Sequence, residues 1–197
     1  MEKDTRSKLI EIATQLFANR GFAAVSVREL TVAAQVNVSA ISYYFNGKES
    51  LYRAVLKEQL APLLQALALA KGYESPFAAE RLSFYANQIT QIHVQRPFLS
   101  HFISNEVNYP TGHGGAIIEN HISQVHQFVE DALQEGVANG DFRADLNITY
   151  SAIALDGIIN FYFISKPLYQ KFISFPEEAN VEYMNHAFQI YLRGIMS

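Results

Sequence analysis

Residues 21–52 of the chain read GFAAVSVRELTVAAQVNVSAISYYFNGKESLY, and this stretch decides the fold. Its residues 26–29 (SVRE) have the spacing of a capping box, in which a serine and a glutamate bond to each other's backbone N–H groups and start a helix. A tight turn over residues 34–37 separates this helix from a shorter one over residues 38–45, for which Asn37 is a suitable N-cap. The stretch therefore predicts two short helices joined by a tight turn, which is the helix-turn-helix arrangement.

The sequence on both sides of this motif is helical as well. Apolar residues upstream of it recur in steps of three and four, which predicts a helix over about residues 5–20 that stops at Gly21. A fourth helix follows the motif and reaches Pro62, a residue that kinks or ends a helix. We expect a DNA-binding domain over residues 1–58 and a ligand-binding and dimerisation domain over residues 59–197.

Proline and glycine residues divide the remaining sequence into further helical segments. The expected helices cover residues 77–94, 97–107, 115–139, 147–165 and 177–195. The sequence has neither the alternation typical of strands nor an internal repeat. The expected fold class is all-α: a three-helix helix-turn-helix head and a larger helical body, with about nine helices in total.

Composition restricts the class of protein. Hydrophobic residues make up 49% of the chain and charged residues 17%, which predicts a folded globular protein. The absence of cysteine excludes disulfides and thiol catalysis. The N-terminus leads into an amphipathic segment without the apolar core of a signal peptide, and no uninterrupted apolar run of about 18 residues follows. We therefore expect a cytoplasmic protein that does not bind membranes.

Charge is distributed unevenly along the chain. The formal net charge is -4, yet residues 1–58 carry eight Lys and Arg against six Asp and Glu. The rest of the chain is correspondingly acidic. Contact with phosphates favours basic segments, so the asymmetry indicates that only the N-terminal part meets a polyanion.

The predicted helix over residues 38–45 has one apolar side and one side of small or polar residues. Val36, Ile41 and Phe45 fall on the first side. An outward face of small residues can enter a DNA major groove, where hydroxyls bond to base edges or phosphates. The candidate DNA contacts, including flanking residues, are Ser26, Arg28, Asn37, Val38, Ser39, Ser42, Tyr43, Tyr44 and Lys48. Spacing alone would suit an ordinary helical hairpin with a solvated polar face equally well.

Residues 21–52 as a whole resemble the DNA-binding signature of the TetR family of repressors. The matching positions are Gly21, Ser26, Val27, Leu30, Ala34, Val36, Tyr43, Tyr44, Phe45, Lys48, Glu49 and Leu51. Gln35 departs from the family, which usually has glycine there in a conformation of positive φ. Gln35 must therefore accept a modest strain, or the turn must differ slightly.

The resemblance implies a homodimer that acts on double-stranded operator DNA. Its two recognition helices would enter successive major grooves of a pseudo-palindromic operator. A small-molecule effector in the body would favour the conformation that fits DNA poorly, and operator DNA would weaken effector binding by the same factor. Repression is the usual mode of the family, although some members activate.

The last two predicted helices have more apolar surface than one face can bury, which often indicates a partner on each side. We expect both helices to pack against their symmetry mates in a four-helix interface. The candidate interface residues are Leu155, Ile159, Tyr162, Met184, Phe188 and Tyr191. The alternative is that both helices are core helices of a monomer.

The body is rich in Phe and Tyr, which favours an effector that is mostly apolar or aromatic. The candidate pocket residues are Tyr85, Phe98, His101, Phe102, His121 and Phe128, and core packing would explain the aromatic ones equally well. Four histidines could orient a ligand: His93, His101, His121 and His126. They are not expected to bind metal, because none of them forms the i, i+4 pair of a helical zinc site. No cofactor is expected.

An enzyme and a scaffold protein are the two alternative classes of function. An enzyme would need paired carboxylates, a catalytic triad or a phosphate loop, and the glycine-rich segment 112–115 lacks the lysine and Ser/Thr of such a loop. A scaffold protein would have the same helices, and specific DNA binding would distinguish it from a regulator. The sequence favours the regulator.

Overall fold

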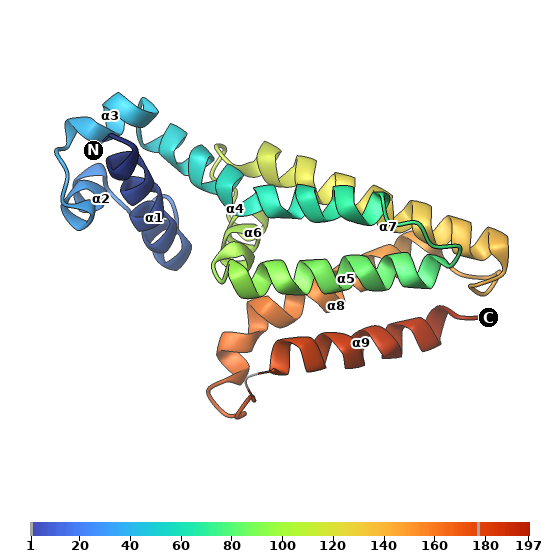
Figure 1. Ribbon diagram of the computed structural model, residues 1–197. Coiled ribbons are helices and arrows are strands. Elements are labelled where there is room, and N and C mark those ends of the chain that lie inside the picture. The colour runs from blue at the N-terminus through green and yellow to red at the C-terminus, as the bar shows by residue number, and fades with distance from the viewer. Residues whose placement is uncertain (1, 177) are drawn as a thin grey trace. The chain divides into compact units, whose positions relative to one another are not determined.

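The computed structural model describes residues 2–176 and 178–197, and these fold mainly into helices (Figure 1). The helices are α1 (Glu2–Arg20), α2 (Val27–Ala34), α3 (Ser39–Phe45), α4 (Lys48–Lys71), α5 (Ala78–Gln95), α6 (Leu99–Asn108), α7 (Gly115–Asn139), α8 (Ile148–Tyr169) and α9 (Ala179–Ile195). Within the described ranges there is no strand, only an isolated antiparallel bridge between Phe142 and Met196. The predicted all-α class is confirmed.

Two helices continue through proline: Pro62 does not end α4, and α8 extends beyond its expected end at residue 165. α4 passes Pro62 and ends at Lys71, and α8 passes Pro167 and ends at Tyr169. A proline removes one backbone hydrogen bond, but tertiary packing supplies most of a helix's stability in a protein. Beyond Pro62, α4 still buries Leu63 and Leu67 among other apolar residues, which explains why the helix continues.

The chain folds into two compact units. Unit 1 contains the chain up to Ala61 and residues Phe98–Asn120, and unit 2 contains Pro62–Pro97 and His121–Ser197. The predicted domain boundary after residue 58 falls inside α4 and remains a prediction. Unit 1 thus includes α6 from the middle of the chain in addition to the N-terminal helices.

An aromatic cluster forms the centre of unit 1. Helix α1 packs against α2 and α6, and α2 packs against α3. The rings of Phe17 and Tyr52 meet edge-on with centroids 5.2 Å apart, and Phe102 of α6 lies 6.2 Å from Tyr52. All three side chains are at most 2% exposed, so α6 completes the core on which the N-terminal helices rest.

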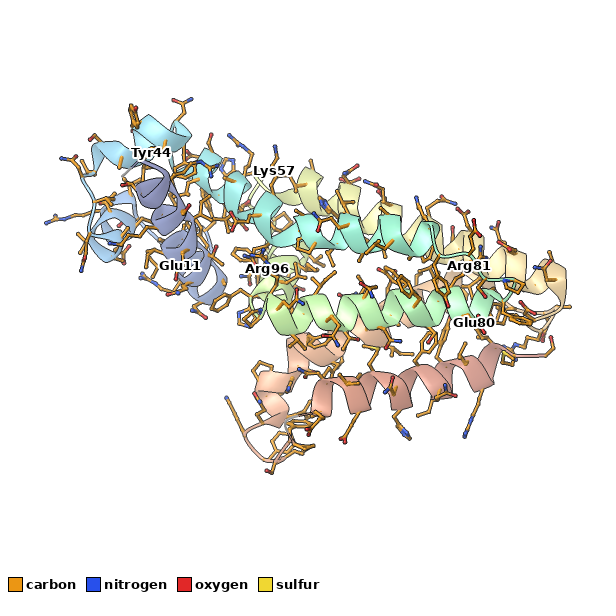
Figure 2. All side chains as sticks on the ribbon, in the orientation of Figure 1. Glu11, Tyr44, Lys57, Glu80, Arg81 and Arg96 are labelled. Carbon is orange, nitrogen blue, oxygen red and sulfur yellow. The ribbon has the colours of Figure 1, made fainter. Side chains whose placement is uncertain are left out.

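In unit 2 the helices α5, α8 and α9 pack against one another (Figure 1). Near the start of α5, where Figure 2 labels it, Arg81 forms an ion pair with Glu135 of α7. Gly136 allows a close approach of Phe142, because a Cβ atom at this position would lie 2.3 Å from the phenylalanine ring. The ion pair therefore connects α5 to α7, and the small Gly136 leaves room for the Phe142 ring beside α7.

Candidate functional site

The start of α2 is held by the capping box that the spacing of residues 26–29 predicts. The Ser26 hydroxyl accepts a hydrogen bond from the Glu29 N–H at 3.2 Å, and the Glu29 carboxylate accepts one from the Ser26 N–H at 2.8 Å. Arg20, the last residue of α1, donates to the same carboxylate at 2.8 Å. Hydrogen bonds from Ser26 and then Arg20 lower the pKa of Glu29 to about 2. Glu29 therefore joins the end of α1 to the start of α2.

The turn between α2 and α3 has the backbone conformation that glycine usually adopts, although the turn contains no glycine. Gln35 has φ 54° and ψ 47°, in the left-handed region, and its N–H bonds to the Val32 carbonyl at 3.1 Å. The N–H of Val36 bonds to the Thr31 carbonyl at 3.0 Å. Of the two alternatives that the sequence left open, Gln35 therefore accepts the strain of a positive φ, at a cost of about 1–2 kcal/mol for an L-residue.

Helix α3 starts one residue later than predicted, at Ser39. The N-cap position is Val38, which has no side-chain cap. The Asn37 side-chain oxygen instead accepts from the Ser39 N–H at 2.9 Å and from the Ser39 hydroxyl at 2.8 Å. A short Asn side chain bonds readily to the backbone two residues on. The Asn37 side chain therefore pairs the Ser39 N–H at the start of the helix.

The two sides of α3 differ in burial as the sequence predicts. Ile41 and Phe45 are buried, at 1% and 7% exposed. Val38, Ser39, Ser42 and Tyr43 are exposed. The apolar side therefore fixes the helix to unit 1, and the side with small and polar residues faces outward.

Two tyrosines lie together near the end of α3, where Figure 2 labels Tyr44. The rings of Tyr43 and Tyr44 meet edge-on with centroids 4.8 Å apart. Tyr43 is 74% exposed, whereas Tyr44 is half-buried beside Phe45. Tyr43 is therefore the more accessible of the two side chains.

Lys48 is the first residue of α4 and lies over an aromatic ring. Its Nζ atom is 4.1 Å from the centre of the Phe22 ring, a cation–π arrangement. Burial lowers the pKa of Lys48. The sequence reasoning missed Phe22, because no local spacing relates a residue after α1 to one at the start of α4.

The candidate DNA contacts all come from adjacent elements of unit 1. Ser26 and Arg28 lie at the start of α2, Asn37 and Val38 in the turn, and Lys48 at the start of α4. Ser39, Ser42, Tyr43 and Tyr44 belong to α3. Their contact with DNA remains a prediction, supported by an outward face of small residues next to the exposed Arg28 and the half-buried Lys48.

The candidate pocket residues are divided between the two units. In unit 2, Tyr85 of α5 and Phe128 of α7 are buried with ring centroids 5.4 Å apart. His121 of α7 is also buried. In unit 1, Phe98 and His101 meet with ring centroids 6.2 Å apart, and the core of that unit accounts for Phe102. Their role as pocket residues remains a prediction.

His126 of α7 lies between two carboxyl groups. Its Nε2 is 3.5 Å from Glu130, and its Nδ1 is 3.6 Å from Asp156 of α8. Burial raises the pKa of Asp156 to about 6, and attraction to His126 opposes this rise. A search of the described residues for three or more His, Asp or Glu side chains suited to one metal ion finds none.

The six candidate interface residues lie inside the protomer. Leu155, Ile159, Tyr162, Met184, Phe188 and Tyr191 are between 0% and 7% exposed. They form the contact of α8 and α9 with the rest of unit 2. These six side chains therefore belong to the core of one protomer. The expected interface on these two helices remains a prediction. It would use the faces of α8 and α9 that lie opposite the six buried residues.

Known proteins match the chain most strongly in the helix-turn-helix region. The family model described as "Bacterial regulatory proteins, tetR family" matches residues 9–55. The probable HTH-type transcriptional regulator YttP of Bacillus subtilis is 47% identical over 58 residues, which cover 29% of this chain and 28% of that protein.

Longer matches extend into the body. The HTH-type transcriptional repressor KstR2 of Rhodococcus jostii is 25% identical over 150 residues, 73% of this chain and 70% of that protein. The solved structure of the ketosteroid transcriptional regulator KstR2 of Mycobacterium tuberculosis has a TM-score of 0.79 at 21% identity, covering 98% of this chain and 95% of that one. The chain therefore shares the fold of that structure over the 98% that the match covers.

Proposed function

Because the chain belongs to the TetR family of bacterial regulatory proteins, we propose that it is a ligand-responsive transcriptional repressor that binds a pseudo-palindromic operator as a homodimer. The observation that carries this proposal is α3, a short helix whose apolar side is buried and whose outward side offers Ser39, Ser42 and Tyr43. Such a helix can enter a major groove without steric conflict. Members of the family are regulators of transcription and not enzymes.

The flanking elements supply contacts to the DNA backbone. Arg28 is exposed at the start of α2, and Lys48 stands at the start of α4, where the helix dipole also favours phosphate. Arg20 contributes little, because its charge is paired with Glu29. Serine hydroxyls and the Tyr43 hydroxyl would then bond to base edges or phosphates.

A second copy of the chain would cover the outer face of α8. This face, which we call the α8 stripe, consists of Tyr150, Ile153, Phe161, Ile164 and Leu168, which are between 37% and 72% exposed. Soluble proteins rarely leave such a continuous apolar surface uncovered. A two-fold axis would pair the stripe with its own copy, together with exposed Ile190 on α9.

The stripe also bears on membrane association. Among the described helices α8 is long and apolar enough to cross a membrane, judged by length and composition only. Its other face, however, buries Ala152, Leu155 and Ile159 within unit 2. We assign the stripe to the dimer, because a DNA-binding dimer needs one such surface. Without a role for the stripe in a membrane, we place the protein in the cytoplasm.

Unit 2 would bind the effector, a mostly apolar or aromatic small molecule. Buried rings such as Tyr85 and Phe128 would contact it. The effector must bind more tightly to the conformation that fits DNA poorly, and operator DNA then weakens effector binding by the same factor. Without this difference in affinity, the effector would not change the binding of operator DNA.

The test is fluorescence anisotropy of labelled DNA from immediately upstream of the protein's own gene. Purified protein is titrated at two salt concentrations against unrelated competitor DNA. We expect binding that resists the competitor and weakens as salt rises. The matched control is the variant Tyr43→Ala, which should remain dimeric and bind the labelled DNA more weakly. If neither this DNA nor genomic fragments selected by binding are preferred over the competitor, the proposal is wrong.

A further inference from the structure

Unit 1 contains a pocket beside the end of α1 and the end of α6. Its volume of about 390 Å³ lies in the range of pockets that hold small molecules, roughly 300–1,000 Å³. The wall consists of residues 18–24, Tyr52, Asn105, Tyr109 and Thr111. All of them belong to unit 1, so the pocket is separate from the effector site proposed for unit 2.

Aromatic rings form part of this wall. The rings of Phe22 and Tyr52 both line the pocket, with centroids 5.0 Å apart. Tyr109, which follows the last residue of α6, is 80% exposed and contributes a third ring. Aromatic rings pack against one another, and their faces also attract cations. The wall therefore suits a planar aromatic group, a cation, or a molecule that contains both.

The ends of two helices make the pocket favourable for positive charge. Residues 18–20 form the end of α1, and Asn105 lies in the last turn of α6. The last four carbonyl groups of a helix lack partners within it and carry partial negative charge, which favours cations and N–H donors. The side-chain amides of Asn19 and Asn105 add two further oxygen acceptors to the wall.

A buried carboxyl group is bonded to two residues of this wall. Both oxygens of Glu106 accept hydrogen bonds, from the Tyr52 hydroxyl and from the hydroxyl and N–H groups of Thr111, which is the pattern of an ionised carboxylate. These donors are neutral, and no Lys, Arg or His among the described residues forms an ion pair with Glu106. A cation in the pocket would supply the missing opposite charge.

The other charged groups near the pocket compensate one another. Arg20 lines the pocket, but its guanidinium donates to the Glu29 carboxylate at 2.8 Å. Lys48 is attracted by Glu29 and Glu49, which raise its pKa against the effect of burial. Two cations thus stand near two carboxylates, and Glu106 is the carboxylate that they leave without an opposite charge.

We propose that this pocket of unit 1 binds a small aromatic cation. The N–H groups of the cation donate to the carbonyl groups at the end of α1, and its ring packs against Phe22 and Tyr109. A neutral or anionic molecule of the same shape binds more weakly, because it offers no positive charge to Glu106. The site goes beyond the proposed function and does not depend on it, since neither DNA nor the effector pocket of unit 2 takes part.

The first experiment compares ligands of the same shape and different charge: benzamidine, which is a cation at neutral pH, neutral benzamide, and the anion benzoate. The full-length protein is labelled with ¹⁵N, and the variants Asn19→Ser and Asn105→Ser assign the side-chain resonances of these two residues of the wall. We expect benzamidine to shift both resonances until the site is saturated. Its affinity should exceed that of benzamide by at least about tenfold, and benzoate should bind more weakly than benzamide.

The second experiment repeats these titrations on variants whose folding is checked by circular dichroism. Tyr109→Leu removes an exposed ring of the wall and should weaken benzamidine binding about two- to fivefold, the factor expected for an exposed cation–π contact. Tyr73→Leu, the matched control, changes an exposed tyrosine of unit 2 and should leave the affinity unchanged. Glu106→Gln removes the buried charge and should bring the affinities for benzamidine and benzamide close together.

Benzamide or benzoate binding as tightly as benzamidine overturns the proposal, and so do Asn19 and Asn105 resonances that stay unshifted up to the solubility limit of benzamidine. A folded Glu106→Gln that keeps the full preference for benzamidine overturns it too. If Glu106→Gln does not fold, the three ligands and Tyr109→Leu decide. Neither experiment includes DNA, so failure of the anisotropy titration would reject the regulator function separately.

Discussion

The Tyr52 hydroxyl on α4 donates a hydrogen bond of 2.6 Å to the carboxyl group of Glu106 on α6. Both side chains are at most 3% exposed, and 54 residues of sequence separate them. The Thr111 hydroxyl donates to the same oxygen of Glu106 at 2.7 Å. Burial and the neighbouring carboxyl group together raise the pKa of Tyr52 well above its ordinary value. The polar pair joins α4 to α6 within the core of unit 1.

The variant Tyr52→Phe should lower the free energy of unfolding by about 1–3 kcal/mol, because it removes a donor from a buried carboxyl group. Urea unfolding at a fixed protein concentration measures the change. Tyr43→Phe is the matched control, since Tyr43 is 74% exposed, and it should change stability by less than about 0.5 kcal/mol. Equal stability of the two variants would show that the bond contributes nothing.

The variant Lys48→Ala should weaken operator binding without altering sequence preference, since a phosphate contact carries no sequence information. The plot of log affinity against log salt should become shallower by about 1. Lys57→Ala makes the same charge change farther along α4, on an exposed residue outside the candidate contacts, and should leave the slope as it is. The same loss in both variants would indicate a general charge effect.

The variant Gln35→Gly should stabilise the protein by up to about 1 kcal/mol, because glycine adopts the observed positive φ without steric strain. The higher entropy of glycine in the unfolded chain limits the gain. Gln35→Val should destabilise it, because a branched side chain is disfavoured at this φ. Thermal unfolding measures both variants, and a stabilising valine would refute the strain argument.

Two groups in unit 2, the half-buried Asp156 and the buried His93, should give opposite dependences of stability on pH. The pKa of Asp156 is raised from 3.8 to about 6 by burial. Between these values the unfolded state has already lost the proton that the folded state keeps, so the contribution of Asp156 to stability falls as pH rises. Asp156→Asn should therefore gain about 1–3 kcal/mol relative to wild type between about pH 4 and pH 6.

The pKa of His93 is lowered from 6.5 to about 4, again by burial. Here the unfolded state binds the proton and the folded state does not, so the contribution of His93 is lost as pH falls from about 6.5 to about 4. His93→Phe should therefore gain stability relative to wild type on acidification. Urea unfolding across this range measures both variants, and changes of the same sign would contradict the assignments.

If the proposed dimer uses the α8 stripe, the variant Phe161→Glu should be a folded monomer, because it places a charge in the middle of the stripe. Analytical ultracentrifugation measures the mass, and circular dichroism shows whether the helices persist. Val107→Glu adds the same charge at an exposed apolar residue of unit 1 and should stay dimeric. A dimeric Phe161→Glu would place the interface elsewhere.

Local sequence patterns predict the helix-turn-helix well, because its geometry depends on neighbours in the chain. The capping box needs only Ser26 and Glu29, three residues apart. The positive φ of Gln35 was one of two alternatives that the family resemblance left open. The faces of α3 likewise follow from a clear division between apolar and polar residues. These predictions needed no long-range contact.

The faces of α8 could not be predicted in the same way. This helix is apolar on most sides, so periodicity does not show which side packs inside the protomer. Ile159 and Phe161 are both strongly apolar, yet one is 1% and the other 62% exposed. Only the tertiary contacts of α8 with α5 and α9 distinguish them. The same holds for the burial of His93, whose ring stacks on Phe163 of another helix.

Unit 1 is built from two separate segments of the chain, and this restricts which segments can be exchanged with those of related proteins. A chimera that takes only residues 1–58 from this chain would separate Tyr52 from Glu106 and from the Phe102 ring. The foreign α6 would have to offer an acceptor and an aromatic ring at the same places. Residues 98–120 must therefore be transferred together with the N-terminal helices. We expect a substitution in one segment to be accompanied in related proteins by a substitution at the contacting position of the other.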